Sequence, residues 1–299
     1  MKTSPFFRLF LVVALLGTGS GFLSIALSNI LLYPVRGGLP NKVPTIPGTP
    51  FIANNASGQK IAAWWYPGNP AAGAVLLCHG HCVSHLHILD MAEFLHAAGY
   101  NILALDFRAH GLSEGCHTAI GLHEWEDVDA VIKAAETNGF LPPTMPLAAY
   151  GRSMGAATLA NGSSRLGRIG AFILESSFAE LRNIAARDVR RVSGIPDSFL
   201  LDGLFFLAKV RSGIDYASNR PVDAIKGVGG RPLLLIHDGL DPRATREDHD
   251  RLKAAVPAAK EMIVPDAGHV QAHRPPPDPF ESVILQFLND SKVLPAPSK

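Results

Sequence analysis

Short apolar runs recur along the chain from about residue 51 onward, and longer stretches of mixed apolar and polar positions separate them. Short apolar runs bounded by turn residues are typical of buried strands, whereas the longer mixed stretches are typical of helices. The expected strands are 74–78, 147–150, 171–174, 232–236 and 261–264, and the expected helices include 91–98, 125–135, 156–166 and 280–288. This alternation predicts an α/β domain with a mostly parallel sheet covered by helices on both faces.

The N-terminal segment has a different pattern, because no charged residue occurs from Leu9 to Tyr33. About 20 apolar residues suffice to cross a bilayer as a helix, so we expect residues 1–33 to form an uncleaved single-pass membrane anchor. The domain that follows is then expected to face away from the cytosol. The alternative is a cleaved signal peptide, which leaves a secreted or periplasmic protein.

Proline content and the positions of the expected strands and helices predict how the rest of the chain is divided into a linker, a main domain and a tail. Residues 34–50 are rich in proline and are expected to form a semi-rigid linker. The main domain is predicted over 51–290, followed by a C-terminal tail at 291–299. No internal repeat is visible in the sequence.

The interval between the expected strands 171–174 and 232–236 is longer than an ordinary crossover. We therefore predict a small helical lid over residues 177–231. Its apolar runs at 199–201 and 204–207 fit either the wall of an apolar pocket or a core helix packed on the sheet. The second interpretation is favoured, because apolar helix faces usually serve packing.

The formal net charge of +1 provides no basic excess for a nucleic-acid partner. Imidazole and thiol side chains gather in two neighbouring stretches, but without the paired spacing of a zinc site, so we predict neither a metal nor another cofactor. These residues are His79, His81, Cys82, His85, His87, Cys116 and His117. A disulfide between Cys82 and Cys116 is left open.

The candidate chemistry begins at residues 151–155, where Gly-Arg-Ser-Met-Gly follows the expected strand 147–150. This pattern is typical of a nucleophile elbow, in which a sharp strand-to-helix turn exposes a serine hydroxyl. Glycines two positions on either side allow the helix and the neighbouring strand to pack closely. Ser153 is therefore the predicted nucleophile.

A serine hydroxyl needs a histidine to accept its proton and a carboxylate to orient that histidine. Asp241 follows the expected strand 232–236, and His269 follows the expected strand 261–264. We predict these two residues as the acid and the base, in the chain order that accompanies this elbow. Asp238 and Glu175 are the alternative acids, and His273 is the alternative base.

These motifs resemble the α/β-hydrolase superfamily, and within it the serine hydrolases of the monoacylglycerol lipase, lysophospholipase and serine aminopeptidase type. The resemblance covers His79-Gly80, the turn at 106–115, the elbow at 151–155, Asp241 and His269. Ala109 stands in the turn where these proteins usually have glycine. Elsewhere in the same turn, Arg108 and His110 are expected to brace loops rather than to act in catalysis.

The resemblance implies an α/β-hydrolase fold and two backbone oxyanion donors, the N–H groups of His81 and Met154. It also implies hydrolysis of a carboxylic ester through an acyl-enzyme, with a small-molecule or lipid ester, or a thioester, as substrate. A peptidase or an acyltransferase with the same triad is the alternative, and a non-catalytic binding protein is the third. The sequence does not predict the oligomeric state.

Overall fold

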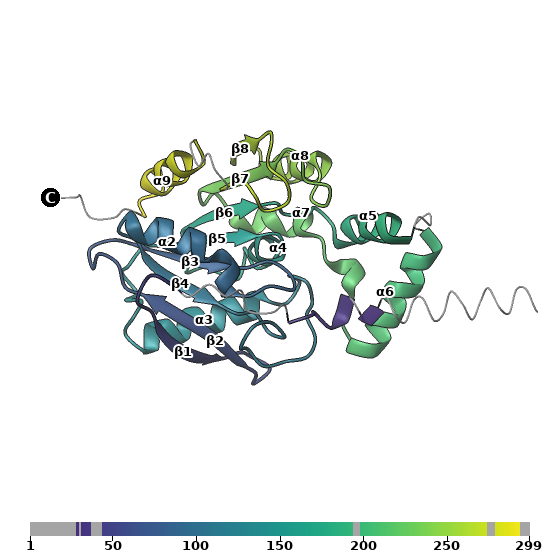
Figure 1. The fold of residues 1–299 in the computed structure, drawn as a ribbon, viewed down its shortest axis with the longest axis horizontal. Coiled ribbons are helices and arrows are strands. Elements are labelled where there is room, and N and C mark those ends of the chain that lie inside the picture. Colours follow the sequence, from purple (N-terminus) through teal and green to yellow (C-terminus); the bar gives the residue numbers. More distant parts are fainter. Residues whose placement is uncertain (1–27, 30, 37–43, 194–197, 274–278, 294–299) are drawn as a thin grey trace, which may run out of the picture.

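The computed structural model describes residues 28–29, 31–36, 44–193, 198–273 and 279–293 (Figure 1). Its centre is an eight-stranded sheet with the order β1-β2-β4-β3-β5-β6-β7-β8. The pairs β1–β2 and β2–β4 are antiparallel, and all other neighbouring strands are parallel. The strands are β1 (Thr49–Asn54), β2 (Lys60–Tyr66), β3 (Ala74–Cys78), β4 (Asn101–Leu105), β5 (Leu147–Arg152), β6 (Ala171–Glu175), β7 (Leu233–Asp238) and β8 (Lys260–Val264).

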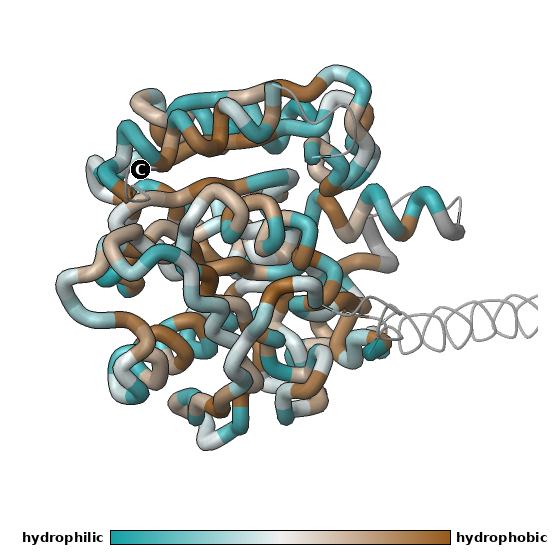
Figure 2. Tube along the Cα trace, turned by 60° about the vertical axis from the view of Figure 1, so that its left-hand side comes forward, coloured by the Kyte–Doolittle hydropathy of each residue, from teal (hydrophilic) through white to brown (hydrophobic). Residues whose placement is uncertain are grey.

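Helices cover both faces of this sheet, as the alternating pattern predicted (Figure 1). Successive side chains of a strand point to opposite faces, so Leu76 of β3 packs in one core and Leu77 in the other. One face carries α2 (Leu89–Ala97) and α9 (Phe280–Asp290), and the other carries α3 (Trp125–Thr137), α4 (Met154–Asn161) and α8 (Arg246–Ala255). Figure 2 shows hydrophobic residues gathered along the strands and on the helix sides that face them.

The parallel register brings the carboxyl ends of the central strands to one edge. Cys78 at the end of β3 pairs with Gly151 of β5, and Arg152 pairs with Glu175 at the end of β6. Loops that leave such strand ends lie side by side, which is where open α/β sheets place their ligand sites.

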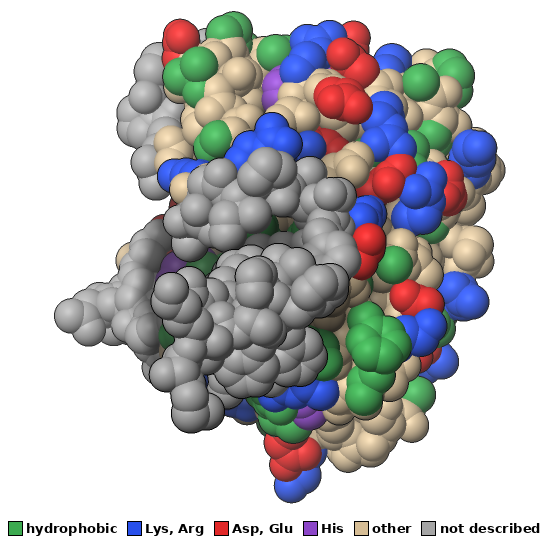
Figure 3. All heavy atoms as spheres, turned by 90° about the vertical axis from the view of Figure 1, so that its right-hand side faces the viewer, with side chains coloured by type: hydrophobic (Ala, Val, Ile, Leu, Met, Phe, Trp, Pro, Cys, Tyr) green, Lys and Arg blue, Asp and Glu red, His purple; other side chains and the backbone are tan. Residues whose placement is uncertain are grey.

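The interval between β6 and β7 contains α5 (Leu181–Ser193), α6 (Ser198–Ser212) and the short α7 (Pro221–Ala224). In Figure 1, α5 and α6 project beyond the end of the sheet. Leu201, Leu204 and Phe205 of α6 are buried, whereas Phe206 is 66% exposed. The side chains of Phe199 and Leu200, which the sequence analysis placed in the same apolar run, lie outside the described side chains. On the face toward which these helices project, acidic and basic side chains are intermixed (Figure 3).

The predicted membrane anchor lies mostly outside the described residues, which begin at Ser28. Within the described part of the chain, no helix has the length and apolar character needed to cross a membrane. Leu31 and Leu32, at the end of the same segment, are buried against the domain.

Candidate functional site

Ser153 occupies the sharp turn between β5 and α4. Its backbone has φ 53° and ψ −113°, a positive-φ conformation outside the favoured regions that a serine adopts only under steric constraint. The turn depends on its two glycines. A Cβ on Gly155 would lie 2.2 Å from the carbonyl oxygen of Cys78, and one on Gly151 would lie 2.6 Å from the nitrogen of Ala156. The helix therefore packs directly on the end of β3, as the elbow pattern predicted.

The structure brings Ser153, His269 and Asp241 together from three separate loops. His269 Nε2 lies 3.0 Å from Ser153 Oγ, and His269 Nδ1 lies 2.7 Å from Asp241 Oδ2. These are hydrogen-bond distances, and the histidine is held between the hydroxyl and the carboxylate. This is the geometry a serine needs to pass its proton to an imidazole.

The carboxylate of Asp241 is held by its own loop. Its Oδ1 accepts hydrogen bonds from the N–H groups of Arg243 at 2.8 Å and Ala244 at 3.0 Å. Burial alone would raise the pKa of Asp241, but the hydrogen bond and charge of His269, with the Arg243 N–H, lower it below its ordinary value. The group therefore remains a carboxylate at neutral pH.

The loops after β7 and β8 are packed against each other, which fixes the distance between acid and histidine. The N–H of Leu240 donates to the carbonyl of Ala267 at 2.8 Å. Gly239 allows this approach, because a Cβ there would lie 2.4 Å from the carbonyl oxygen of Pro265.

Asp238, the nearer alternative to Asp241, is turned toward a different partner. Its Oδ2 accepts a hydrogen bond from Ser176 Oγ at 2.5 Å, while its buried Oδ1 has no hydrogen-bond partner. Burial and the nearby charge of Glu175 raise the pKa of Asp238 to about 7. The residue supports the loop of His269, because its Oδ2 accepts from the N–H of Gln271 at 3.4 Å and its partner Ser176 Oγ accepts from the N–H of Val270 at 3.3 Å.

The other two alternatives, Glu175 and His273, belong to a network around Arg152. The Arg152 Nε donates to Glu175 Oε2 at 3.0 Å, and Nη2 donates to His273 Nδ1 at 2.7 Å. Nη1 donates to Asp90 at 3.0 Å, and His273 Nε2 also bonds Asp90. Tyr150 adds a hydrogen bond to Glu175. Glu175 and His273 therefore bond to this network, and neither is hydrogen-bonded to the hydroxyl of Ser153.

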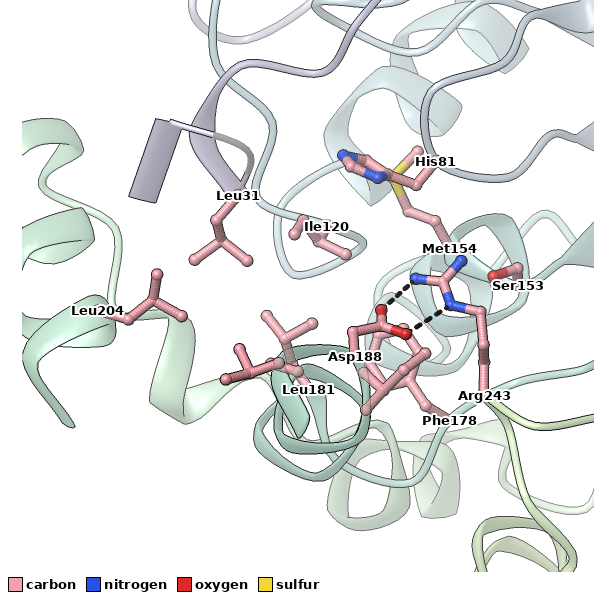
Figure 4. Close-up of a pocket in the computed structure, with 13 residues that line it drawn as sticks. Leu31, His81, Ile120, Ser153, Met154, Phe178, Leu181, Asp188, Leu204 and Arg243 are labelled. Carbon is pink, nitrogen blue, oxygen red and sulfur yellow. Dashed lines mark hydrogen bonds and ion pairs between the residues drawn. The ribbon is translucent and has the colours of Figure 1, made fainter. Parts of the chain in front are cut away.

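The predicted oxyanion donors, His81 and Met154, both lie close to Ser153 (Figure 4). Met154 begins α4, and N–H groups in the first turn of a helix have no acceptor within the helix. His81 follows Gly80, where an added Cβ would lie 3.6 Å from the Cβ of Ser153. Both residues line the cavity that contains Ser153 (Figure 4).

The side chain of His79 ties the same loop to the end of β4. Its Nε2 accepts from the N–H of Phe107 at 3.0 Å, and its Nδ1 bonds the carbonyl of Gly80 at 2.7 Å. Burial lowers the pKa of His79 to about 3, so the ring is neutral and one nitrogen serves as the acceptor. These two hydrogen bonds of His79 therefore hold the loop that contains His81 in place.

The turn after β4 is also held by internal contacts. Arg108 donates to Asp127 and Glu126 of α3, with Nη2 distances of 2.7 and 2.9 Å. His110 Nδ1 bonds the Arg108 carbonyl at 2.9 Å. Ala109 has φ 64°, the left-handed region that favours the glycine usual at this position. Ala109 thus adopts the backbone conformation that glycine favours at this position.

Two cavities meet at Ser153. The first, about 190 Å³, is mainly apolar and lies between the elbow and α5 and α6 (Figure 4). Its apolar lining comprises Leu31, Ile120, Met154, Phe178, Leu181, Ile184, Ala185, Val189 and Leu204. The second, about 390 Å³, is more polar, and its lining includes His87, Asp90, Arg152, His269 and His273.

Arg243 lines both cavities and joins the loop of Asp241 to α5. Its Nη2 donates to Asp188 at 2.7 Å, an ion pair drawn in Figure 4. Neither Arg243 nor Leu31 was predicted as a site residue. Only the three-dimensional structure shows that they line the site, because an arginine in a loop and a leucine in an apolar segment form no recognisable sequence motif.

The histidine and cysteine residues considered for a metal site are dispersed through these loops. In the described part of the chain, no three His, Cys, Asp or Glu side chains are arranged to hold a metal ion. Cys82 and Cys116, whose pairing the sequence left open, are both free thiols, as is the buried Cys78.

Comparison with known proteins identifies the family of the chain. Residues 69–267 match the model of the family described as serine aminopeptidase, S33. The uncharacterized protein Rv2307c of Mycobacterium tuberculosis is 25% identical over 293 residues, 95% of each chain. The uncharacterized protein YqkD of Bacillus subtilis is 24% identical, over 81% of this chain and 79% of that protein. The esterase Pf2001 of Pyrococcus furiosus has a similar structure, with a TM-score of 0.68 and 25% identity, over 87% of this chain and 98% of that chain.

Proposed function

Because the chain belongs to the serine aminopeptidase S33 family and has the α/β-hydrolase fold, as its sequence predicted, we propose that it is a serine hydrolase that cleaves carboxylic esters. The observation that carries this proposal is the chain of hydrogen bonds from Ser153 through His269 to Asp241. A hydroxyl at hydrogen-bond distance from an oriented imidazole is the arrangement that nucleophilic catalysis requires.

In the proposed reaction, Ser153 Oγ attacks the ester carbonyl carbon and its proton passes to His269 Nε2. The carbonyl oxygen becomes negative, and the backbone N–H groups of His81 and Met154 stabilise it. Collapse of the intermediate breaks the bond to the leaving oxygen, which takes the proton from His269 and departs as an alcohol. Asp241 stabilises the imidazolium form and keeps its Nδ1–H oriented.

Water then completes the cycle. His269 takes a proton from the water, whose oxygen attacks the acyl carbon bound to Ser153 Oγ. When the second intermediate collapses, the proton returns to the serine and the carboxylic acid leaves. No cofactor enters this scheme.

The two cavities support an assignment of the two halves of the substrate. We assign the acyl group to the apolar cavity beneath α5 and α6, and the leaving group to the polar cavity beside Arg152. At about 190 Å³ the apolar cavity lies below the range of roughly 300–1,000 Å³ typical of drug-sized ligands. This size favours an acyl group of short to medium length.

The charges of the site favour an ester over the amino-terminal end of a peptide. Recognition of an α-ammonium group requires a carboxylate that is free to pair with it. The carboxylates that line the two cavities already have partners, since Asp90 pairs with Arg152 and Asp188 pairs with Arg243. Aminopeptidase activity is therefore the weaker candidate.

A panel of p-nitrophenyl esters of increasing acyl length, assayed beside aminoacyl p-nitroanilides, tests the proposal. We expect ester hydrolysis to exceed anilide hydrolysis and to fall by at least about 1,000-fold in Ser153→Ala. Ser57→Ala, at an exposed position in the turn before β2, is the control and should retain the wild-type rate. Anilide hydrolysis above ester hydrolysis would favour the peptidase, and undiminished activity of Ser153→Ala would remove the proposed nucleophile.

A further inference from the structure

Leu31 lies in the wall of the apolar cavity although it comes from the segment that precedes the α/β domain. The match to the family model begins at residue 69, so this wall is supplied from outside the matched region. Leu31 is only 9% exposed, and Leu32 beside it is fully buried. The N-terminal segment is thus built into the site rather than attached at a distance from it.

Polar contacts on both sides of Leu31 hold the segment in place. Arg211 of α6 donates to Ser28 Oγ at 2.6 Å, and the N–H of Thr118 donates to the carbonyl of Leu32 at 3.2 Å. Arg36 donates to the carbonyl groups of Gly111 and Gly115 at 3.0 and 2.9 Å.

Aromatic contacts add to this attachment. The guanidinium of Arg211 lies 5.6 Å from the ring centre of Tyr33, and the Tyr33 ring lies 4.8 Å from that of His117. The segment therefore bridges α6 and the loop after β4.

Leu31 and Leu204 stand at the end of the cavity away from the nucleophile. In Figure 4 Ser153 and Leu204 lie on opposite sides of the group, and Ile120 and Leu181 lie between them. An acyl chain that extends from Ser153 along the apolar walls therefore meets Leu31 and Leu204 last.

We propose that Leu31, together with Leu204, sets the acyl-chain length that the enzyme accepts. The inference rests on the proposed ester hydrolysis and on the assignment of the acyl group to this cavity. Removal of the Leu31 side chain lengthens the cavity, and a larger side chain shortens it. One methylene in an apolar pocket changes kcat/KM by about 10-fold or more, so a change of several carbons at the cavity end is measurable.

The test uses the full chain and the ratio of kcat/KM for p-nitrophenyl decanoate to that for p-nitrophenyl butyrate. We expect Leu31→Ala to raise this ratio by about 10-fold and Leu31→Trp to lower it by about 10-fold. Leu204→Ala should shift the ratio in the same direction as Leu31→Ala. A ratio does not depend on the folded fraction of each preparation, so partial loss of folding does not imitate the effect.

Leu32→Ala is the matched control, because it removes the same side chain from the adjacent buried position, which does not line the cavity. Its ratio should equal that of the wild type within about 2-fold. If wild-type ester hydrolysis requires Ser153 but the ratio is unchanged in both Leu31 variants, the inference about Leu31 is wrong and the proposed function stands. If the wild type hydrolyses no ester, the proposed function itself fails.

Discussion

Asp238 and Asp241 are carboxyl groups three positions apart, yet the structure gives them opposite environments. Asp241 receives hydrogen bonds from His269 and from two backbone N–H groups, which lower its pKa against the effect of burial. Asp238 is buried near Glu175 with one oxygen unpartnered, and its pKa is raised to about 7. The two residues differ in role because the carboxylate of Asp241 points toward His269 and that of Asp238 does not. Their distances from the end of the strand do not decide it.

This difference predicts unequal effects of the same substitution on activity. Asp241→Asn should lower kcat for ester hydrolysis by about 10,000-fold, because an amide no longer holds His269 in the required tautomer. Asp238→Asn should lower it by less than about 10-fold, since an amide oxygen can still accept the hydrogen bond from Ser176. Steady-state kinetics on both variants measures these losses of kcat. A larger loss in Asp238→Asn than in Asp241→Asn would identify Asp238 as the acid of the triad.

The raised pKa of Asp238 also predicts a pH dependence of stability. An unfolded aspartate titrates near 4, so between about pH 4 and pH 7 the folded protein binds the extra proton. The favourable contribution is complete below about pH 4 and is lost as the pH rises to about 7, with a magnitude of up to about 4 kcal/mol. Asp238→Asn has no such titration. The difference between its Tm and that of the wild type should therefore increase in the variant's favour from about pH 4 to pH 7 and stay constant above pH 7.

Melting curves of the wild type and Asp238→Asn from pH 4 to pH 8 provide the measurement. Asp266→Asn, an exposed substitution in the neighbouring loop, is the control and should remain parallel to the wild type. A constant Tm difference between Asp238→Asn and the wild type across this range would contradict the raised pKa.

Residue patterns in the sequence predicted much of the site. Ser153 and His269 follow from the elbow and from a glycine-containing loop after an apolar run, and both come together in the structure. The run at 261–264 was expected to be a buried strand, but β8 is the last strand of the sheet and only Met262 in it is buried. The choice of Asp241 over Asp238 rested on position in the loop pattern and on the interpretation of Asp238 as a turn former. Sequence alone does not show which carboxylate faces the histidine, because the geometry of the loop decides that. The Arg152–Asp90 ion pair was not predicted, since Asp90 precedes Arg152 by 62 positions and no local pattern links them.

At the scale of elements, helix α4 and strand β3 determine where the nucleophile sits. The strand of the elbow was predicted from its apolar run, and the helix begins at Met154, two residues earlier than the range 156–166 predicted. An apolar pattern does not mark this start, because the strained turn at Ser153 leads directly into the helix. The chain can turn directly from strand to helix because Gly155 has no side chain where it packs against Cys78.

Gly155→Ala tests this close packing. A Cβ would lie 2.2 Å from the backbone oxygen of Cys78 at the end of β3, and a backbone atom cannot give way as the end of a flexible side chain can, so we expect a loss of about 3 kcal/mol or more in the free energy of unfolding. Gly167→Ala is the matched control, because no heavy atom lies within 4 Å of its added Cβ. Denaturant unfolding compares them, and equal stabilities of the two variants would contradict the tight contact.

Helices α5 and α6 lie within residues 177–231, the range predicted as a lid. The sequence left open whether the apolar residues of α6 line a pocket or pack as core. The structure gives a mixed answer, because all three of Leu201, Leu204 and Phe205 pack in the core but only Leu204 also lines the apolar cavity. Periodicity identifies a buried helix face but not which of its residues border an empty volume.

At the scale of the whole molecule, the site depends on segments far apart in the chain. Leu31 precedes the sheet, Ser153 follows its central strand β5, and His269 follows its last strand. The membrane anchor over residues 1–33 stays a prediction, and its main part lies outside the described residues. Leu31 and Leu32, which that range includes, are buried against the domain. If the residues before them form the anchor, the cavity wall at Leu31 lies immediately after it, and the protein should remain with membranes after carbonate washing.

The central claim is that Ser153 is the nucleophile of an ester hydrolase. The most direct measurement is covalent labelling of the intact protein by a fluorophosphonate probe, followed by mass spectrometry of the labelled peptide. We predict one modification, at Ser153, that is absent in Ser153→Ala, strongly reduced in His269→Ala and unchanged in Ser57→Ala. Equal labelling of Ser153→Ala, or a folded wild-type protein that takes up no label, would contradict the account.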